Sequence, residues 1–252
     1  MKNVLVSIIT VVFNGEKTIE KTIKSVLNQS YSNIEYLIID GGSTDSTVDI
    51  ITKYESKLSY WVSEKDQGIA DAFNKGIQKA RGEIIGIINA DDWYEKDAVK
   101  SIVSEYTGDN EIICAKIKLW NTDKLYKIKT STLDGIEKQM KIWHPGVFVP
   151  RKVYSGVGLY DINIKILMDY DFVIRCMQHN VKFKFIDACI SNMKSGGISN
   201  RLIYKSMKES LNIKNNYFGR RIKNFIEYVY FLCYYSLLIS VKDILYKREG
   251  YD

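Results

Sequence analysis

Apolar runs that end in polar turn residues and lead into helical periodicity constrain this chain more than any other feature. The first run, LVSIITVVFN at residues 5–14, is continuous and β-branched, which is typical of a strand buried on both faces. An apolar stripe at helical spacing follows within residues 16–30, made of Ile19, Ile23, Val26 and Leu27. The segment IEYLIIDGGSTDS at residues 34–46 supplies a second strand, a glycine turn and helix-capping residues. Strand, helix and strand within about forty residues predict a βαβ unit with a parallel sheet.

The alternation continues to residue 106 and then changes. Strands are predicted at residues 58–63 and 83–92 and helices at 68–80 and 95–106, so the first half is expected to be a doubly wound α/β domain. Beyond it, residues 111–129 predict two antiparallel strands around an NTD turn. The later pattern predicts a helix at 165–180 and a half-exposed strand at 181–187.

The composition fits one large domain, or one domain with an extension. The chain has 252 residues, 46% of them hydrophobic, which is enough to bury a sizeable core. We predict reduced core thiols, and neither a disulfide framework nor a zinc site, from the scattered cysteines Cys114, Cys176, Cys189 and Cys233. The short apolar run at the N-terminus has no small-residue cleavage site, so we interpret it as a strand and expect a cytoplasmic protein.

Positive charge and uncharged aromatic residues are concentrated in residues 201–252. Ten Lys/Arg against five Asp/Glu give this segment +5 of the chain's net charge of +6, which predicts an anionic partner. Within it, Tyr228–Val241 has fourteen residues without a formal charge, fewer than the roughly 20 that a membrane span needs. This stretch fits a helix packed on the domain or on a partner subunit, a homo-oligomer included, or a helix lying on a membrane surface. Its aromatic residues are not interleaved with basic ones, so no nucleic acid is expected.

Polar side chains follow three of the predicted parallel strands, where ligands bind in open α/β sheets. They are Asn14 (which follows Phe13), Asp40, and Asp91 with Asp92. Neither GxGxxG nor GxxxxGK[ST] is present, so a dinucleotide-binding or P-loop enzyme is disfavoured. The negative charge of a bound diphosphate must then be neutralised in another way, and Mg²⁺ or Mn²⁺ held by carboxylates can do this. Asp91 fits the metal, whereas Asp92 fits a helix cap better, and Asp40 alone fits a cap or turn equally well.

Two long blocks resemble family 2 glycosyltransferases of the GT-A fold. They are VSIITVVFNGEKTIEKTIKSVLNQSYSNIEYLIIDGGSTDST at residues 6–47 and SEKDQGIADAFNKGIQKARGEIIGIINADD at residues 63–92. A third, WHPGVFVPRKVYSGVGLYDINIKILMDYDFVIRC at residues 143–176, is similar to the acceptor half of that family. The resemblance implies a Rossmann-like α/β fold with a mixed sheet over residues 1–200, divided into a nucleotide-sugar half (1–110) and an acceptor half (111–200). Residues 201–252 are then expected to form basic, aromatic-rich C-terminal helices.

The resemblance also implies roles for individual residues of the donor half. Val11 and Phe13 match positions that line the base pocket, and Asp40 matches the aspartate that hydrogen-bonds the uracil ring nitrogen. Asp91 matches the last acid of the D-x-D motif, the metal ligand. Asn89 stands at the first acid of that motif, a departure that removes one negative charge and leaves an oxygen ligand. The other positions assigned to substrate binding in these blocks are Asn14, Gly68 and Asn74.

In the acceptor half, the resemblance aligns Asp169 of MDYDFVIR with the general base and places Met168 at the usual glutamate position. A base is needed because a sugar hydroxyl is a poor nucleophile until its proton is removed. Asp171 competes for this role, although an ion pair with Arg175 at i+4 also fits it. His144 in WHPG fits either a structural histidine or a contact with the donor diphosphate or the acceptor. Arg201 ends KSGGISNR, which fits either a mobile loop closing over the phosphates or a plain turn.

These patterns together predict a metal-dependent, inverting glycosyltransferase. The resemblance implies that it moves a hexose or N-acetylhexosamine from a UDP-sugar to a saccharide acceptor. The basic C-terminal segment favours a lipid-diphosphate-linked acceptor at the inner face of the plasma membrane, in bacterial O-antigen or capsule synthesis. The alternatives are a non-catalytic nucleotide-sugar or glycan-binding module of the same fold, favoured by Asn89 and Met168, and a nucleotidyltransferase, for which VVFNGEKTI is a poor phosphate loop.

Overall fold

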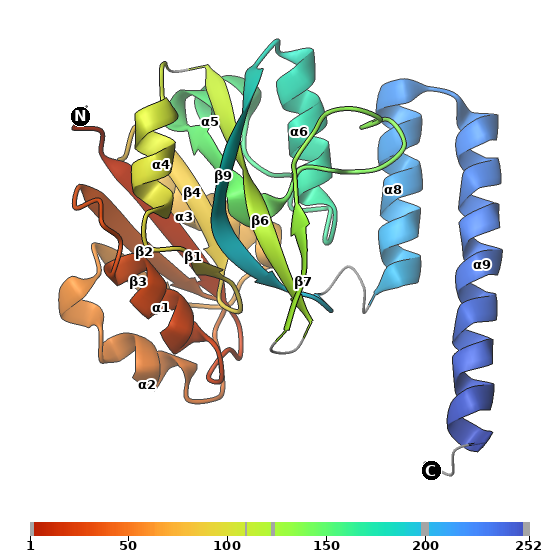
Figure 1. The fold of residues 1–252 in the computed structure, drawn as a ribbon, viewed down its shortest axis with the longest axis horizontal. Helices are drawn as coiled ribbons and strands as arrows, with labels where there is room; N and C mark the ends of the chain where they lie inside the picture. The colour runs from red at the N-terminus through yellow and green to blue at the C-terminus, as the bar shows by residue number, and fades with distance from the viewer. Residues whose placement is uncertain (1–2, 109, 122–123, 198–201, 249–252) are drawn as a thin grey trace. The chain divides into compact units, whose positions relative to one another are not determined.

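The protein consists of two compact units, Met1–Ser195 and Gly196–Asp252, which we call the first and the second unit. The computed structural model describes residues 3–108, 110–121, 124–197 and 202–248, the last range without the side chains of residues 237–248 (Figure 1).

In the described part of the first unit, nine strands form one mixed sheet (Figure 1). Four neighbouring strands are parallel, in the order β3 (Tyr60–Ser63), β2 (Ile34–Asp40), β1 (Val6–Val12) and β4 (Ile84–Asn89). The sheet continues from β4 through β8 (Val147–Pro150), β6 (Glu111–Asn121), β9 (Lys182–Lys194) and β5 (Trp93–Tyr94). A further strand, β7 (Lys124–Lys129), pairs with β6. The mixed α/β sheet that the sequence predicts is confirmed.

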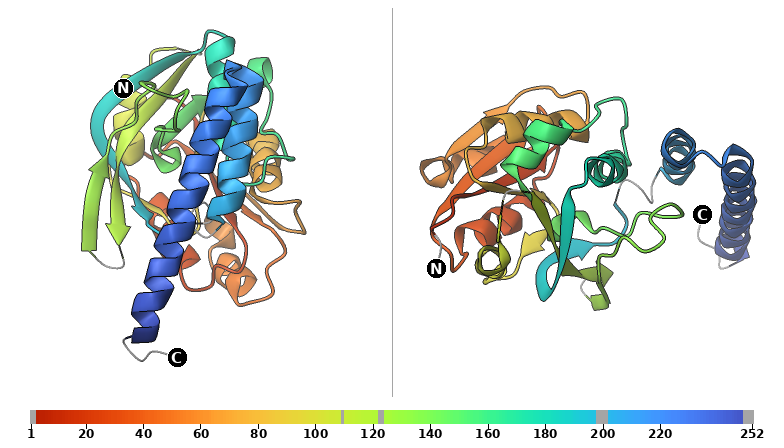
Figure 2. Two further views of the ribbon diagram at one scale, coloured as in Figure 1. Left: turned by 90° about the vertical axis from the view of Figure 1, so that its right-hand side faces the viewer. Right: turned by 90° about the horizontal axis from the view of Figure 1, so that it is seen from above.

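Helices cover both faces of the parallel strands (Figure 2). The first face carries Val6 and Ile8 of the fully buried β1 and packs on α1 (Ile19–Leu27) and α4 (Ala98–Glu105). The opposite face packs on α3 (Ile69–Lys79), as the contact between Ile9 of β1 and Gly76 of α3 shows. The remaining short helices before β4 are α2 (Thr47–Thr52), beside α1, and η1 (Glu55–Lys57). The doubly wound arrangement is therefore confirmed.

A glycine sets the distance between α3 and β1. A Cβ atom at Gly76 would lie 2.5 Å from Cγ2 of Ile9 on β1, so a larger residue would push the helix away from the sheet. The same helix carries Asn74 and begins directly after Gly68. The distance between α3 and the sheet therefore sets how far Asn74 and Gly68 lie from the sheet.

The parallel register aligns the polar strand ends. Val12 of β1 is the register partner of Asp40 at the end of β2, and Val11 is the partner of Asn89 at the end of β4. Because all three strands run in the same direction, the loops that follow them leave the sheet at one edge. We call this the carboxyl edge.

The second half of the first unit differs from the first, as its sequence predicts. β6 and β7 pair antiparallel, on either side of residues 122–123, which lie outside the described residues. η2 (His144–Gly146) leads into β8, which is followed by α5 (Arg151–Val157). The predicted helix at 165–180 is α6 (Met168–Gln178), so the helix begins later than predicted. The Lys165 ammonium group, before the helix, donates to the carbonyl of Gln67 at 2.8 Å.

All four cysteines are free, so the prediction of reduced thiols is confirmed. Cys114 and Cys176 are buried, and their burial raises the pKa of each thiol to about 12. Cys189 is half-buried. Cys233 is exposed, so the expectation that it is a core residue is wrong.

The second unit is a helical hairpin of α8 (Ile203–Phe218) and α9 (Arg221–Arg248). Gly219 and Arg220 join the helices with φ angles of 72° and 35°. The amide of Asn224 donates to Asn215 Oδ1 and to the carbonyl of Gly219, at 2.9 and 3.1 Å, which ties the turn to both helices. Among the residues that the structure describes, no helix is long and apolar enough to cross a membrane.

Candidate active site

The loops after β1 and β2 are fastened together at the carboxyl edge by Asn14, whose φ is 50°. Its backbone N–H donates to Ser43 Oγ at 2.7 Å, and its side-chain oxygen accepts from the backbone N–H of Thr44 at 2.9 Å. The Gly15 N–H donates to Thr47 Oγ1 at 2.8 Å. The side chain of Asn14, predicted to bind substrate, therefore holds the two loops that surround the proposed donor position.

Asp40 is buried and already saturated with hydrogen bonds. Its Oδ2 accepts from the backbone N–H groups of Gly42 and Ser43 and from the Ser63 hydroxyl, at 3.1, 2.9 and 2.6 Å, and its Oδ1 accepts from the Ser43 hydroxyl. The sequence allowed Asp40 to contact the base, to cap a helix or to stabilise a turn, and these hydrogen bonds are those of a turn residue. The carboxylate fixes the loop after β2 and presents no exposed oxygen to a ligand.

Val11 and Phe13, predicted to line the base pocket, differ in their exposure. Val11 is buried within β1, whereas the Phe13 side chain is 63% exposed directly beyond the strand. An exposed aromatic ring at a ligand-binding edge offers a flat apolar surface on which a nucleotide base can stack.

The segment after β3 closes over the loop after β2. The Glu64 N–H donates to the Asp40 carbonyl at 3.0 Å, and Asp66 Oδ2 lies 2.3 Å from the point where a Cβ of Gly41 would stand. The segment ends at Gly68, whose φ of 121° is a conformation that only glycine adopts readily. Gly68 thus serves the backbone turn that starts α3.

Asp91 and Asp92, adjacent in sequence, lie in opposite environments after β4. Asp91 is exposed, while Asp92 is buried and its Oδ1 accepts from the backbone N–H of Lys194 at the end of β9, 3.2 Å away. Burial, and then the charge of Asp91, raise the pKa of Asp92 well above its usual value. The expectation of a helix cap for Asp92 is therefore wrong, because the next helix, α4, has Asp97 at its N-cap and the Asp92 side chain binds the end of β9.

The donor set at this edge fits a cation that shares its ligands with a substrate. Among the described residues, no group of three or more His, Cys, Asp or Glu side chains could hold a metal ion by itself. The exposed carboxylate of Asp91 and the half-buried Asn89 offer oxygen ligands. Mg²⁺ and Mn²⁺ accept one or two protein oxygens when phosphate oxygens complete their shell. These residues therefore fit a metal bound together with a diphosphate.

The two candidate bases on α6 differ in their partners. Asp171 is buried, and Arg175 Nε donates to its Oδ2 at 2.8 Å, so the ion pair that the i, i+4 spacing predicts is present. Asp169 is half-buried, and its Oδ1 accepts from the Tyr170 N–H at 2.8 Å. Burial raises the pKa of Asp169 to about 6. A carboxylate that titrates near neutral pH suits proton abstraction, so the raised pKa makes Asp169 the better candidate for the base than the ion-paired Asp171.

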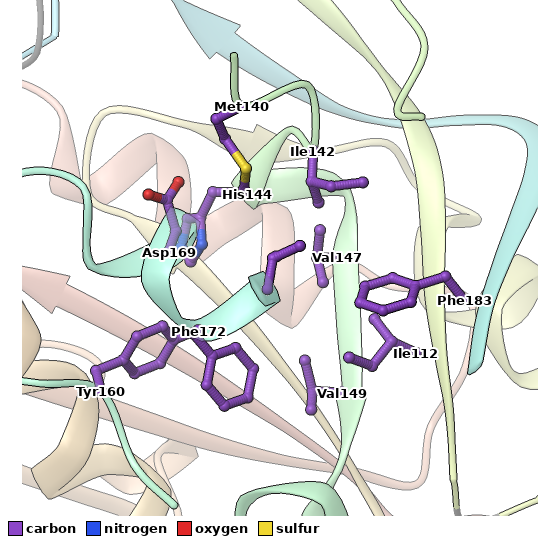
Figure 3. A pocket seen from close by; sticks show the side chains of 11 residues that line it. Ile112, Met140, Ile142, His144, Val147, Val149, Tyr160, Asp169, Phe172 and Phe183 are labelled. Carbon is purple, nitrogen blue, oxygen red and sulfur yellow. The ribbon is translucent and has the colours of Figure 1, made fainter. Parts of the chain in front are cut away.

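Asp169 borders a small cavity of about 20 Å³, which has room for about one water molecule. Its other walls are mostly apolar (Figure 3): Ile112, Met140, Ile142, His144, Val147, Val149, Tyr160, Phe172, Val173 and Phe183. This apolar lining accounts for the raised pKa of the carboxyl group.

His144 lines the same cavity and is held by an aromatic stack. Its ring packs on Phe73 of α3 with centroids 4.9 Å apart and planes 11° apart. Its Nε2 is buried without a hydrogen-bond partner among the described residues, and burial lowers the pKa of His144 to about 4. The imidazole is therefore neutral at physiological pH and brings no positive charge to a diphosphate.

Asn74 links α3 to the acceptor half. Its Nδ2 donates to the carbonyl of Tyr160 at 2.8 Å, and its Oδ1 accepts from the Tyr160 N–H at 3.0 Å. Because the side chain is buried with both polar atoms engaged, the structure gives it a positioning role where the sequence predicted substrate binding. Tyr160 in turn packs on Phe73 and Phe172, beside Asp169.

Sequence reasoning missed the Asn74–Tyr160 contact and the side chain of Asp66, because both contacts join segments that are far apart in the chain. The glycine pair Gly41–Gly42 was the available signal for Asp66, since adjacent glycines mark a close approach by another segment. Arg201, predicted to act in a phosphate loop, lies outside the described residues.

Known proteins share both the sequence pattern and the fold. The sequence model described as Glycosyl transferase family 2 matches residues 7–156. The PGL/p-HBAD biosynthesis glycosyltransferase of Mycobacterium tuberculosis is 26% identical over 214 residues, which cover 81% of this chain and 83% of that protein. Residues 1–349 of S. aureus TarS, solved in complex with UDP, match with a TM-score of 0.64 and 19% identity over 87% of this chain and 68% of that one. A mannosyltransferase from Pyrobaculum calidifontis, solved with GDP-Man and Mn²⁺, matches with a TM-score of 0.64 and 15% identity over 88% and 65% of the two chains.

Proposed function

The chain belongs to glycosyl transferase family 2, and from that premise we propose that it transfers a hexose or an N-acetylhexosamine from a UDP-sugar to a saccharide hydroxyl with inversion. The observation that carries the proposal is Asp169, a half-buried carboxylate with a pKa of about 6 at the start of α6. A base of this strength is partly to fully ionised at neutral pH and still takes a proton readily.

The reaction that fits this site is a single displacement. Asp169 removes the proton of the acceptor hydroxyl as the oxygen forms a bond to the anomeric carbon. The bond between that carbon and the UDP oxygen breaks on the opposite face, and its electron pair leaves with the diphosphate. One displacement inverts the configuration, so an α-linked donor gives a β-linked product.

The carboxyl edge is the proposed donor site. Phe13 would support the base by stacking, and Asp91 and Asn89 would hold a Mn²⁺ or Mg²⁺ ion together with the diphosphate. When bound, such an ion neutralises the charge that develops on the leaving group. The UDP in the TarS structure and the GDP-Man with Mn²⁺ in the mannosyltransferase structure support a nucleotide donor and a metal in this fold.

The second unit supports an acceptor held at a membrane. On α9, Ile222, Phe225, Ile226 and Val229 are exposed at helical spacing, with exposed fractions of 38% to 81%. Arg221 and Lys223 lie in the first turn of the same helix, directly after Arg220. An exposed apolar stripe beside basic residues suits the surface of an anionic membrane. We therefore place the enzyme peripherally at the inner face of the plasma membrane, with a lipid-diphosphate-linked saccharide as acceptor in surface polysaccharide synthesis.

The test is a donor screen with Mn²⁺ and a lipid-diphosphate-linked sugar, in which product is measured by mass spectrometry. We expect a UDP-hexose or UDP-N-acetylhexosamine to be consumed, and UDP to be released slowly by hydrolysis without acceptor. UDP binding with no turnover of any donor would instead favour a nucleotide-sugar-binding module. The absence of UDP binding would refute the proposed donor class.

A further inference from the structure

We propose that the hairpin formed by the end of β6 and by β7 docks on an anionic phospholipid membrane and holds the proposed active site at the membrane surface. We call residues 118–121 and 124–129 the β6–β7 hairpin. The inference rests on the proposed function, in which the acceptor is linked to a membrane lipid. It adds to that function a membrane contact in the first unit, the unit that carries the site.

The strand β7 exposes large apolar side chains. Leu125, Tyr126 and Ile128 are 48%, 68% and 50% exposed, whereas every residue of β1 is buried. In the described part of the chain β7 pairs only with β6, so it forms an edge of the sheet. Figure 2 shows the hairpin at the margin of the first unit, with no helix of that unit packed on it. Apolar side chains gathered on such an exposed element mark a contact surface.

Basic side chains accompany the apolar ones. Residues 118–129 contain four lysines and one aspartate, which gives a net charge of +3. Lys124 and Lys127 are exposed on β7 itself. A lysine can lay its methylene stem along an apolar surface while its ammonium group stays in water or beside a phosphate group. Apolar, aromatic and basic side chains together are complementary to the surface of an anionic bilayer.

The hairpin fits a bilayer better than it fits another strand or a second copy of the chain. Lysines and β-bulges are features that keep an edge strand from pairing with another strand. β7 carries the lysines, and its pairing with β6 shifts in register between Leu119 and Trp120. Lys127 and Ile128 are adjacent, so they point to opposite faces of the strand, and both are exposed. A folded partner covers one face of a strand, whereas a fluid bilayer surrounds both.

Both strands of the hairpin contact segments of the proposed active site. Trp120 of β6 packs on Trp93, which follows the two acids at the end of β4, with ring centroids 5.8 Å apart. At the end of β7, the Lys129 ammonium group lies 4.7 Å from the centre of the Trp143 ring. Trp143 directly precedes His144, which lines the cavity beside the proposed base. A docked hairpin therefore holds both halves of the site near the lipid headgroups, where the sugar of a lipid-linked acceptor lies.

The hairpin adds to the membrane contact proposed for α9 and does not replace it. Three apolar side chains bind a bilayer only marginally, and stable attachment takes two contacts. We therefore expect co-sedimentation with vesicles to require α9, and the hairpin to strengthen it.

The first measurement is co-sedimentation of the full chain with vesicles of phosphatidylcholine, with and without phosphatidylglycerol. The combined variant Leu125→Ser, Tyr126→Ser and Ile128→Ser should bind the anionic vesicles about 10-fold or more less tightly than the wild-type chain. Because the three side chains are exposed, the thermal unfolding midpoint should stay at the wild-type value.

The lysines are tested with a charge-matched control. Lys124→Ser with Lys127→Ser should weaken binding to the anionic vesicles about 10-fold at low salt and less at high salt. Lys53→Ser with Lys57→Ser removes the same charge from exposed positions beside β3, at the opposite end of the sheet, and should leave binding unchanged.

The second measurement reports contact with the bilayer directly. Tyr126→Cys, in a chain that also carries Cys189→Ser and Cys233→Ser, is labelled with an environment-sensitive fluorophore. Its emission should rise and shift to the blue on addition of anionic vesicles. The same label at Ser56→Cys, an exposed position of η1 at the other end of the sheet, should not respond.

The outcomes separate this inference from the proposed function. Wild-type-like vesicle binding of the apolar variant, or a label at position 126 that does not respond, would overturn the inference and leave α9 and sugar transfer intact. Self-association in sedimentation velocity that the apolar variant abolishes, with unchanged vesicle binding, would assign the hairpin to a second copy instead. Failure of the wild-type chain to bind any vesicle would overturn the whole membrane placement, whereas the donor screen would still test sugar transfer.

Discussion

Asn74 binds the backbone of Tyr160 with both polar atoms of its side chain, at 2.8 and 3.0 Å, although the residues are 86 positions apart in the chain. The contact joins α3, which starts at the proposed donor site, to the segment that leads to the proposed base. Through Tyr160 it also supports the cavity wall beside Asp169. One buried amide therefore links the proposed donor side of the site to the proposed acceptor side.

Removing this amide should cost both stability and turnover. Asn74→Ala leaves the Tyr160 N–H and carbonyl buried without partners, so we expect a loss of about 1–3 kcal/mol in the free energy of unfolding. Since Tyr160 also supports Asp169, kcat should fall more than UDP affinity. Urea unfolding and steady-state kinetics measure the two effects. Asn163→Ala, at an exposed position of the same segment, is the control, and equal behaviour of the two variants would contradict the alignment role.

Asp169→Asn should reduce turnover by about 10²- to 10⁴-fold, because the amide cannot accept the acceptor's proton. UDP affinity should stay at the wild-type value. Asp187→Asn, at an exposed carboxylate of the same unit, serves as the control. An Asp169→Asn variant that keeps wild-type turnover would remove this residue as the base.

The same carboxyl group predicts the acid limb of the pH profile. Its pKa of about 6 lies above the usual value because burial disfavours the charged form. The base acts only when ionised, so kcat/KM should fall tenfold per pH unit well below pH 6 and level off above it. Initial rates between pH 4.5 and 8 would show this limb, and a rate that stays flat below pH 5 would speak against Asp169.

The neighbouring acids Asp91 and Asp92 should respond differently to the same change. Asp91→Asn should weaken metal-dependent UDP binding by about 10-fold or more, because it removes the exposed carboxylate. Asp92 has a raised pKa, so Asp92→Asn should preserve metal dependence and change mainly stability. Mn²⁺ titrations with and without UDP measure this contrast, and EDTA should abolish activity. Full activity in EDTA, or equal effects of the two variants, would contradict the metal site.

Glu35 makes the fold sensitive to acid. Burial alone would raise its pKa, but the Ser7 hydroxyl and the Arg81 backbone and guanidinium N–H groups outweigh it, so the pKa is lowered. The resulting stability is complete above the unfolded value of about 4.3 and is lost as the pH falls below it. Glu35→Gln should therefore lower the urea midpoint clearly at pH 7 and much less at pH 3.5. A pH-independent difference would refute the ionised network.

The C-terminal hairpin should carry membrane binding. Truncation after Gly219 removes α9 with its exposed apolar stripe and should abolish co-sedimentation with vesicles that contain anionic lipid. Replacing Arg220, Arg221 and Lys223 by serine should weaken the same binding, more strongly at low salt. The truncated protein should still bind UDP. Retention of the truncated chain on vesicles would refute the role of α9.

Periodicity and strand ends predicted the fold because they are local properties of the sequence. The continuous run at β1, the stripe of α1 and the NTD turn between β6 and β7 each specified an element from a few adjacent residues. The resemblance to family 2 glycosyltransferases is confirmed by the match over residues 7–156. Parallel register then brought Val11 beside Asn89 and Val12 beside Asp40, as βαβ topology requires.

The partners of the site residues could not be predicted, because they depend on distances between segments far apart in the chain. Asp40 and Asp66 carry the same side chain, and only the packing of one loop on another decides which keeps an oxygen without a hydrogen-bond partner in the described part of the chain. In the same way, burial and the contact with Lys194 separate Asp92 from Asp91. The residue types predicted which chemical groups are available at the carboxyl edge. The tertiary contacts determine which residue has which role.

The contact between Gly76 and Ile9 sets the distance of α3 from the sheet, and α3 lies between the proposed donor and acceptor sites. One methyl group added at position 76 would push α3 away from the sheet. Asn74, and with it Tyr160, would then move relative to the carboxyl edge, where Phe13 and Asp91 lie. A larger residue at position 76 is therefore expected to change the distance between the proposed donor and acceptor sites. A residue without a reactive side chain can therefore affect catalysis. Substitutions at Gly76 or Ile9 offer a way to change the distance between the proposed sites without altering any group proposed to bind a ligand.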